Sequence, residues 1–330
     1  MQSTTTSRLG VGFISLLAAC SSTASGSSGD DVDAASQHDA AIDGVVDAEP
    51  LSDSQILPDA AVPVCDPSKP FGTPTQLAGI NTTARDIQAV IAGDGKLYFA
   101  SDRTTATNLD IFTSTLNGTT WGTPVALPNF NTTLGETTPA LTADALTMYY
   151  SVTPAGMTTG EVYVTARANT TTAFQAGTAV ANVNDAATDD GDVGVTGDGA
   201  LLYFSSNRSG VYKVYEAIKG GGGAFGAATA ITQINGTVYD AHPRVDAAGT
   251  TMYYSSMRTD GGAQGGADIW MSKRASRAAV WGTPTRVAEL NTAMNESPTY
   301  ISADGCYLLL QSNRAGGTGD QDIYEAKKPL

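Results

Sequence analysis

Short apolar runs separated by turn-forming residues follow one another along most of the chain. In one stretch, four such runs occupy residues 87–92, 97–100, 110–113 and 121–127. They are rich in β-branched and aromatic residues and are bounded by Gly, Asn, Asp or Pro, which is typical of β-strands. We therefore predict four antiparallel strands, named a to d in chain order.

An aromatic residue marks each copy of this four-strand pattern. The sequence Trp-Gly-Thr-Pro at residues 121–124 returns at residues 281–284, with weaker copies elsewhere. The marking residues are Phe71, Trp121, Phe174, Phe225 and Trp281, at spacings of 50, 53, 51 and 56 residues. This period suits four short strands with their turns, so each copy predicts one blade of a β-propeller. No copy shows a helical pattern, and we expect an all-β fold.

The two ends of the repeat region are expected to meet in one blade. The repeat begins with a d-type strand at residues 71–77 and ends after a c-type strand at residues 322–326. Four blades lie wholly inside the chain, and the fifth combines strands a to c from one end with strand d from the other. The prediction is a five-bladed β-propeller closed by its N- and C-terminal strands, which removes two sheet edges. A six-bladed ring with one unrecognised blade is the alternative, although no stretch of suitable length is left over.

Closure gives two cysteines a role. Cys306 lies in the turn between strands a and b of the fifth blade, and Cys65 lies just before the d strand added to that blade. In an antiparallel four-stranded blade these two places fall on the same face. We therefore predict a Cys65–Cys306 disulfide, and two unpaired thiols are the alternative.

Short motifs within the repeats point to a family. Ser-Asp-Arg occurs at residues 101–103, Ser-Asn-Arg occurs at 206–208 and 312–314, and Asp-Ile-aromatic closes strand c in several copies. Over residues 71–330 the chain resembles the WD40-like repeats of TolB-type β-propellers. That resemblance implies a protein-binding platform in the bacterial envelope, with a protein or peptide as partner. The chain departs from TolB in having no α/β domain before the propeller.

The first twenty residues have the features of an export signal. Arg8 precedes an apolar run at residues 9–19 that is too short to span a bilayer. Residues 17–20, Leu-Ala-Ala-Cys, resemble a bacterial lipobox, which implies a lipoprotein signal peptide at residues 1–19 and a lipid on Cys20. Ser21 follows in place of Asp, which by resemblance to Gram-negative lipoproteins favours the outer membrane. An ordinary secretory signal with an incidental Cys20 is the alternative.

The next segment is expected to be a disordered acidic tether. Residues 21–64 contain nine acidic residues and no Lys or Arg, and are otherwise rich in Ser, Ala, Gly and Pro. Such a composition cannot bury enough apolar surface to offset its ordering entropy. With Arg8 as the one earlier charge, the remaining residues 65–330 carry −7 of the net −15. A mildly acidic domain disfavours nucleic acid and an anionic bilayer surface as partners. We therefore expect membrane contact only through the lipid. We also expect a monomer.

An acidic residue stands at the start of strand a in every repeat. The five are Asp86, Glu136, Asp190, Asp240 and Glu296. Because innermost strands line the central channel, we predict that these carboxylates form a ligand-binding ring at one mouth, together with the glycine-rich b–c loops at residues 260–268 and 315–322. The alternative is that each acid pairs with a repeat arginine, namely Arg103, Arg208, Arg258 or Arg314, or caps a neighbouring loop.

The carboxylate ring also supports an enzyme hypothesis. Five-bladed glycoside hydrolases of the arabinanase type are similar in blade number and place carboxylates at the channel mouth. Inverting hydrolysis needs an acid and a base roughly 6.5–9.5 Å apart, and Glu136, Asp190 and Glu296 are the candidates. This sequence does not show the local motifs of the arabinanase-type hydrolases. A binding module is therefore preferred over the carbohydrate-active alternative. Serine-histidine catalysis would depend on His242 alone, because the other histidine, His38, lies in the tether.

A cluster of aspartates is the one candidate for a metal. Asp185, Asp189, Asp190 and Asp192 lie within eight residues, a composition that Ca²⁺ can use. Their spacing does not match an EF-hand loop, and Asp-Gly clusters are commonly turns. We therefore expect no cofactor. The Tyr and Phe pairs inside the b strands, such as Tyr98-Phe99, are expected to be core.

Overall fold

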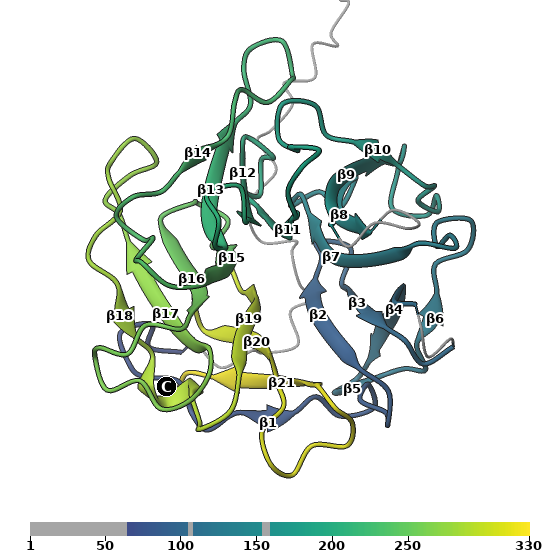
Figure 1. Cartoon of the computed structure of the whole chain (residues 1–330). Coiled ribbons are helices and arrows are strands. Elements are labelled where there is room, and N and C mark those ends of the chain that lie inside the picture. Colours follow the sequence, from purple (N-terminus) through teal and green to yellow (C-terminus); the bar gives the residue numbers. More distant parts are fainter. Residues whose placement is uncertain (1–64, 105–107, 154–158) are drawn as a thin grey trace, which may run out of the picture. The chain divides into compact units, whose positions relative to one another are not determined.

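A computed structural model describes residues 65–104, 108–153 and 159–330 (Figure 1). These residues form five antiparallel β-sheets arranged around a common centre. The predictions for the signal peptide, for Cys20 and for the tether lie outside the described residues. Within the described ranges, no helix is long and apolar enough to cross a membrane.

Each sheet is one blade, and its strands follow one another outward from the centre. The blades are numbered in the chain order of their innermost strands, and blade 1 comprises β2 (Asp86–Ile91), β3 (Lys96–Ser101), β4 (Asp110–Asn117), β5 (Thr120–Trp121) and β6 (Val125–Ala126). Blade 2 comprises β7 (Gly135–Leu141), β8 (Thr147–Thr153), β9 (Glu161–Ala166) and β10 (Thr178–Ala179), and blade 3 comprises β11 (Asp190–Val195), β12 (Leu201–Ser206), β13 (Lys213–Ile218) and β14 (Thr229–Ala230). Blade 4 comprises β15 (Asp240–Val245), β16 (Thr251–Ser256), β17 (Asp268–Lys273) and β18 (Thr285–Arg286), and blade 5 comprises β19 (Glu296–Ile301), β20 (Tyr307–Ser312), β21 (Asp322–Lys327) and β1 (Thr75–Gln76). Neighbouring innermost strands contact one another all the way round, including β19 with β2, so the ring is closed. The predicted five-bladed all-β propeller is confirmed.

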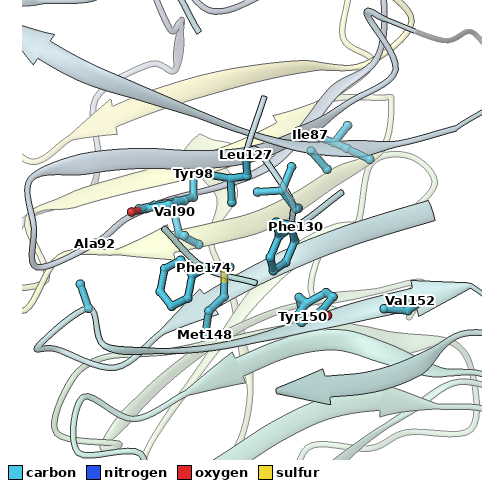
Figure 2. Packing of buried hydrophobic residues seen from close by; sticks show 13 residues of the cluster. Ile87, Val90, Ala92, Tyr98, Leu127, Phe130, Met148, Tyr150, Val152 and Phe174 are labelled. Carbon is cyan, nitrogen blue, oxygen red and sulfur yellow. The ribbon is translucent and has the colours of Figure 1, made fainter. Parts of the chain in front are cut away.

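The hydrophobic core lies between blades. Buried apolar residues form five clusters, and each cluster joins the facing sheets of two neighbouring blades. Figure 2 shows the cluster between blades 1 and 2, where Val90 and Tyr98 of the first blade meet Met148 and Tyr150 of the second. The aromatic pairs of the b strands are almost completely buried here, as predicted. A single blade therefore has no core of its own, which is why the repeats must occur as a ring.

The marking aromatic residues bridge neighbouring blades. Four of the five pack edge-to-face against a tyrosine in the b strand of the preceding blade, a geometry that aromatic rings favour. The ring-centroid distances are 6.4 Å for Phe174–Tyr98, 5.8 Å for Phe225–Tyr149, 6.2 Å for Trp281–Tyr203 and 6.2 Å for Phe71–Tyr253. The repeated aromatic is thus conserved within the chain because it holds each blade to the one before it.

The outer strands are shorter than the sequence suggests. The expected strand at residues 71–77 is reduced to β1, and the run at residues 121–127 is divided into β5 and β6. One turn of 3₁₀-helix, η1 (Ala288–Leu290), also interrupts the otherwise all-β chain.

Blade 5 is completed by the two ends of the propeller. Strand β1 pairs antiparallel with β21, with Thr75 opposite Glu325 and Gln76 opposite Tyr324. The predicted disulfide between Cys65 and Cys306 is present, with 6.0 Å between the two Cα atoms. Strand closure and the covalent link therefore occur in the same blade, as predicted.

Candidate functional site

The five repeated acids begin the innermost strands and are buried. Exposed fractions are 0–1% for all five, namely Asp86, Glu136, Asp190, Asp240 and Glu296. They stand at the end of the ring where strand d of one blade leads into strand a of the next, which we call the d–a end. Their side chains are turned into the loops of this end and do not line an open mouth.

Blade 1 shows how such an acid is held. Asp86 accepts hydrogen bonds from the Thr82 amide at 2.6 Å and from the Thr82 hydroxyl at 2.8 Å. The Arg103 guanidinium lies 2.5 Å from the same carboxylate and also donates to the Ile80 carbonyl. The acid therefore ties the loop before strand a to the loop after strand b.

The arginine contact recurs in three further blades. The ion pairs are Asp190–Arg208 at 2.6 Å, Asp240–Arg258 at 3.1 Å and Glu296–Arg314 at 3.4 Å. Each arginine also donates to a backbone carbonyl of the preceding loop. This is the pairing that the sequence offered as the alternative to a ligand-binding ring. A ligand could reach these carboxylates only by displacing bonds that hold the loops together.

A repeated asparagine, which the sequence analysis did not single out, holds the same loops together. Its side-chain amide donates to a strand-c carbonyl, and its side-chain oxygen accepts from the amide of that same residue. In blade 4, Asn291 makes both bonds with Ile269, at 3.0 and 2.6 Å. The set is Asn81, Asn131, Asn184, Asn235 and Asn291. The sequence does contain a signal for this role, because an asparagine occurs five or six residues before each repeated acid.

Glu136 of blade 2 departs from this scheme. Val152 and Pro154 stand where the other blades have the Ser and Arg of the repeat. Glu136 accepts from the amide and the hydroxyl of Thr132, and it has no ion pair within the described part of the chain. Burial raises the pKa of this carboxyl, and the nearby Asp110 charge adds to the effect. The buried site of Glu136 therefore favours its protonated form more than water does.

Each innermost strand contains a β-bulge where its pairing with strand b shifts register. The shift begins two residues after the acid in blades 1 to 4 and one residue later, at Thr299, in blade 5. In four blades the residue at this point has a positive φ although it is not glycine, namely Gln88 (57°), Thr138 (49°), Asp192 (52°) and His242 (54°). Pro298 stands two residues after the acid in blade 5. Such backbone conformations cost free energy and concentrate at functional sites.

Blades 3 and 4 bring five polar residues of three types together beside their bulges. We call Asp189, Asp192, Tyr212, Tyr239 and His242 the mouth cluster; all five are half-buried. His242 Nε2 lies 3.3 Å from Asp192 Oδ1, and His242 Nδ1 lies 3.1 Å from the Tyr239 hydroxyl. The Tyr239 and Tyr212 rings meet edge-to-face at 5.6 Å, and the Tyr212 hydroxyl donates to Asp189. The result is one connected network from Asp189 to Asp192.

The electrostatics of the mouth cluster favour neutral rings. Burial lowers the pKa of His242, although the Asp192 carboxylate opposes that change. Burial also raises the pKa of Tyr212 and of Tyr239, so both phenols stay protonated at neutral pH. A neutral imidazole protonated on Nε2 satisfies both of its neighbours, because Nδ1 then accepts from Tyr239.

The four aspartates considered for Ca²⁺ do not converge. Asp189 accepts from Gly160 and Tyr212, Asp190 pairs with Arg208, and Asp192 faces His242. Asp185 accepts from the amide of Ala187. Across the described ranges, no three His, Cys, Asp or Glu side chains form a group suited to a metal ion.

The sequence named parts of the mouth cluster without joining them. His242 stood out only as a lone histidine, and Asp189 and Asp192 only as metal candidates. Variation between the repeats at one position is the sequence signal that could have linked these residues to one site. The residue before the repeated acid is Arg85, Gly135, Asp189, Tyr239 or Asn295 in the five blades, so this position differs in every copy.

Comparisons with known proteins support the fold. No protein-family model matches the chain, and no curated protein matches it. Among solved structures, a GH43_1 enzyme from Xanthomonas citri is similar with a TM-score of 0.51 and 14% identity, over 77% of this chain and 90% of that one. A putative TolB from Agrobacterium tumefaciens gives 0.48 and 13%, over 79% and 99%. TolB from Acinetobacter baumannii gives 0.46 and 17%, and the match spans 74% of this chain but 54% of that protein.

The similarity to the GH43_1 enzyme extends over most of this chain at low identity, and it shows the fold alone. One propeller fold hosts many unrelated activities, so function has to be argued from the site.

Proposed function

We propose that this protein is a binding module of the bacterial cell envelope that takes a protein or peptide partner at the d–a end of its propeller. In this proposal Cys20 carries a lipid that holds the protein at the outer membrane. The acidic segment of residues 21–64 then separates the propeller from the membrane surface. The partner contacts the mouth cluster and the d–a and b–c loops around it.

One observation carries the proposal. At the d–a end the repeated acids are bonded inside their own loops, whereas the mouth cluster is partly exposed and occurs on blades 3 and 4 only. Residues that differ between otherwise equivalent positions are not needed for the repeat itself. Their shared position beside a strained bulge therefore indicates selection for contact with something outside the fold.

The chemistry of the mouth cluster suits a basic side chain of a peptide. Tyr212 and Tyr239 offer ring faces that attract cations, and Asp189 and Asp192 add two carboxylates beside them. The net charge of −7 on residues 65–330 favours the approach of a positively charged segment. Met257, 45% exposed, follows strand b of blade 4 and donates its amide to the Tyr239 carbonyl. Exposed methionine adapts well to varied apolar partners.

Peptide binding to the purified full-length protein tests this proposal. An array of peptides from envelope-protein sequences, each paired with a copy whose Lys and Arg are replaced by Gln, should show binding that depends on the basic residues. Tyr239→Ala should weaken that binding about tenfold or more, as expected for a buried aromatic contact. Ile218→Ala, at the last residue of β13 and 58% exposed, is the control and should change nothing. Equal binding by both variants would reject the mouth cluster as the site.

The carbohydrate-active alternative draws on one observation. Glu136 has a raised pKa and no arginine among the described residues, whereas Asp190 is ion-paired, so two neighbouring blades hold unlike carboxyls. A screen against polysaccharides, with and without a chelator, would detect turnover. Loss of that turnover in Glu136→Gln, Asp190→Asn or Glu296→Gln would favour the enzyme. Saturable glycan binding without turnover would favour the module with a glycan ligand.

The lipid anchor is tested separately. Metabolic labelling with a radioactive fatty acid should mark the wild-type protein and not Cys20→Ser. Membrane fractions should then retain the wild-type protein and release the variant. Labelling of the variant would show that Cys20 is not the lipid site.

A further inference from the structure

The central channel contains a cavity at the end opposite the mouth cluster. Its volume is about 320 Å³, and the last residues of all five innermost strands line it, together with the turns that lead into the b strands. Its walls are largely apolar, with Val90, Leu141, Val195 and Ile301 among them. The volume lies at the lower end of the range for small-molecule sites.

Arg244 is the exception in this lining. It lies four residues after the acid of blade 4, where the other blades have Val90, Ala140, Gly194 and Tyr300. The side chain is 4% exposed. A guanidinium placed among small apolar residues at the centre of a ring needs an explanation, because burying a charge without a partner is costly.

The guanidinium of Arg244 is only partly satisfied. Nε donates to the Thr299 carbonyl at 2.8 Å, and Nη1 donates to the carbonyls of Asp192 at 3.0 Å and Pro243 at 2.8 Å. All three acceptors are neutral. Nη2 is buried and has no acceptor among the described residues, and the same residues provide no ion pair.

A second orphaned group lies on the neighbouring strand. The hydroxyl of Thr299 is buried without a partner within the described part of the chain. Thr299 also lines the cavity, and its own carbonyl holds Arg244 Nε. Two unsatisfied donors of adjacent residues thus occur at the wall of one cavity. Buried polar groups are almost always paired, so an acceptor is missing from both.

The charge of Arg244 is only partly compensated. Burial lowers its pKa to about 10 and the nearby Asp192 carboxylate opposes that change, so Arg244 remains a cation at neutral pH. The carboxylate of Asp192 faces His242, at 3.3 Å. Asp304, at the rim of the cavity, accepts from the amide of Cys306. Neither carboxylate forms an ion pair with the guanidinium.

We propose that the cavity binds a monovalent anion, and that the side chains of Arg244 and Thr299 turn so that Nη2 and Oγ1, which are covered in the structure, donate to it. A carboxylate offers one oxygen to each donor, and the apolar walls suit a short aliphatic chain attached to it. We therefore assign a small organic carboxylate as the occupant. A halide ion shares the required chemistry and is the other source to be distinguished. The proposed donors, Arg244 Nη2 and Thr299 Oγ1, are not part of the mouth cluster, although Arg244 Nη1 bonds to the carbonyl of Asp192, which belongs to it.

Calorimetric titration of the full-length protein with butyrate tests the site, and line broadening of ³⁵Cl in nuclear magnetic resonance tests chloride. The wild-type protein should bind butyrate saturably. Thr299→Val replaces an unpaired hydroxyl with a methyl group and should weaken binding about fivefold. Arg244→Lys keeps the charge but removes Nη2 and should weaken binding about tenfold.

Arg167→Lys is the matched control for a buried arginine. Arg167 is held by Asp94 at 2.8 Å and does not line the cavity, so its replacement should leave butyrate binding unchanged. Melting curves without added anion establish that each variant is folded; Thr299→Val is expected to melt no lower than the wild-type protein.

The possible results distinguish the organic carboxylate from a halide and from no anion site. Butyrate binding that falls in Thr299→Val and Arg244→Lys supports the organic carboxylate. Chloride binding with the same dependence and no butyrate binding supports the anion site but overturns the carboxylate as occupant. Absence of saturable binding by either anion, or binding unaffected by both variants, overturns the proposal.

Discussion

Two positions of the innermost strands, only two residues apart, behave in opposite ways. The first position is an acid in every blade, buried and bonded inside its own loops. The bulge position, two residues later and at the start of the bulge in blades 1 to 4, holds Gln88, Thr138, Asp192, His242 and Pro298, five different side chains. One position repeats because the ring needs the same bond five times. The other is free to differ because the backbone, and not the side chain, forms the bulge.

The difference explains why the most regular feature of the sequence is a poor guide to function. A residue that recurs in every blade is explained by what every blade shares, namely the contact between loops. Ligand recognition by a ring of unequal blades needs unequal residues. The mouth cluster meets that condition, and the ring of acids does not.

The largest expected effect is on the acid position. Asp240→Asn removes the charge that receives Lys213 and Arg258, both at 3.1 Å, and leaves two buried cations without their carboxylate. We expect the free energy of unfolding to fall by about 3–5 kcal/mol, measured by urea denaturation.

The control lies at the bulge position of the same strand. His242→Gln introduces the residue that blade 1 already carries at this place with a positive φ. Its free energy of unfolding should change by less than about 1 kcal/mol. A larger loss for His242→Gln than for Asp240→Asn would overturn the comparison.

A smaller effect is expected at the asparagine that supports the acid position. Asn291→Ala deletes a buried side chain that bonds to both backbone groups of Ile269 and to the carbonyl of Val287. The loss should be about 1–3 kcal/mol in urea denaturation. Asn117→Ala, at an exposed site at the end of β4, serves as the comparison and should be nearly neutral. Equal losses at the two sites would mean that the clamp does not stabilise the loops.

Glu136 should depart from the other acids. Its pKa in the folded protein is raised above the usual 4.5, so the stability linked to its protonated form is present below pH 4.5 and lost as pH rises through the folded pKa. At pH 7, Glu136→Gln should therefore be at least as stable as the wild-type protein, within about 1 kcal/mol. Urea denaturation at pH 4.5 and pH 7 checks this. A clear loss of stability at pH 7 would show that the ionised Glu136 is needed as Asp240 is.

The smallest effect is on acid stability at the bulge. The pKa of His242 is lowered from 6.5, so its contribution to stability is complete above pH 6.5 and declines as pH falls through the folded pKa. Asp192, Tyr239 and Arg244 face the imidazole and set the extent of the decline. Between pH 7 and pH 5 the wild-type protein should lose about 1 kcal/mol or less relative to His242→Gln. Parallel stability curves for the two proteins would contradict the lowered pKa.

The fold was largely predictable because its determinants are local and repeated. Strand-length apolar runs and the marking aromatics define the blades, and the d-type copy at Phe71 predicts closure and the disulfide with Cys306. The outer strands were not predictable to the residue.

The candidate site was predictable only in part. A carboxylate at the start of an inner strand looks the same in sequence whether it faces solvent or its own loop, so burial of Asp86 and its equivalents could not be deduced. The meeting of Tyr212 with Tyr239 depends on two blades lying side by side. The positive φ at Asp192 and His242 has no local signal, because neither is glycine.

Closure by distant segments has a consequence for how the protein is made. Cys65 and Cys306 are separated by 241 residues, so β1 leaves the ribosome long before β21 exists to pair with it. Until then β1 has no strand to pair with, and the first blade has no neighbour on one side. Pairing over such a separation is slow, and the open edges are prone to aggregation meanwhile. Ring assembly must therefore wait for late synthesis, and the Cys65–Cys306 disulfide can form only after both segments have been made.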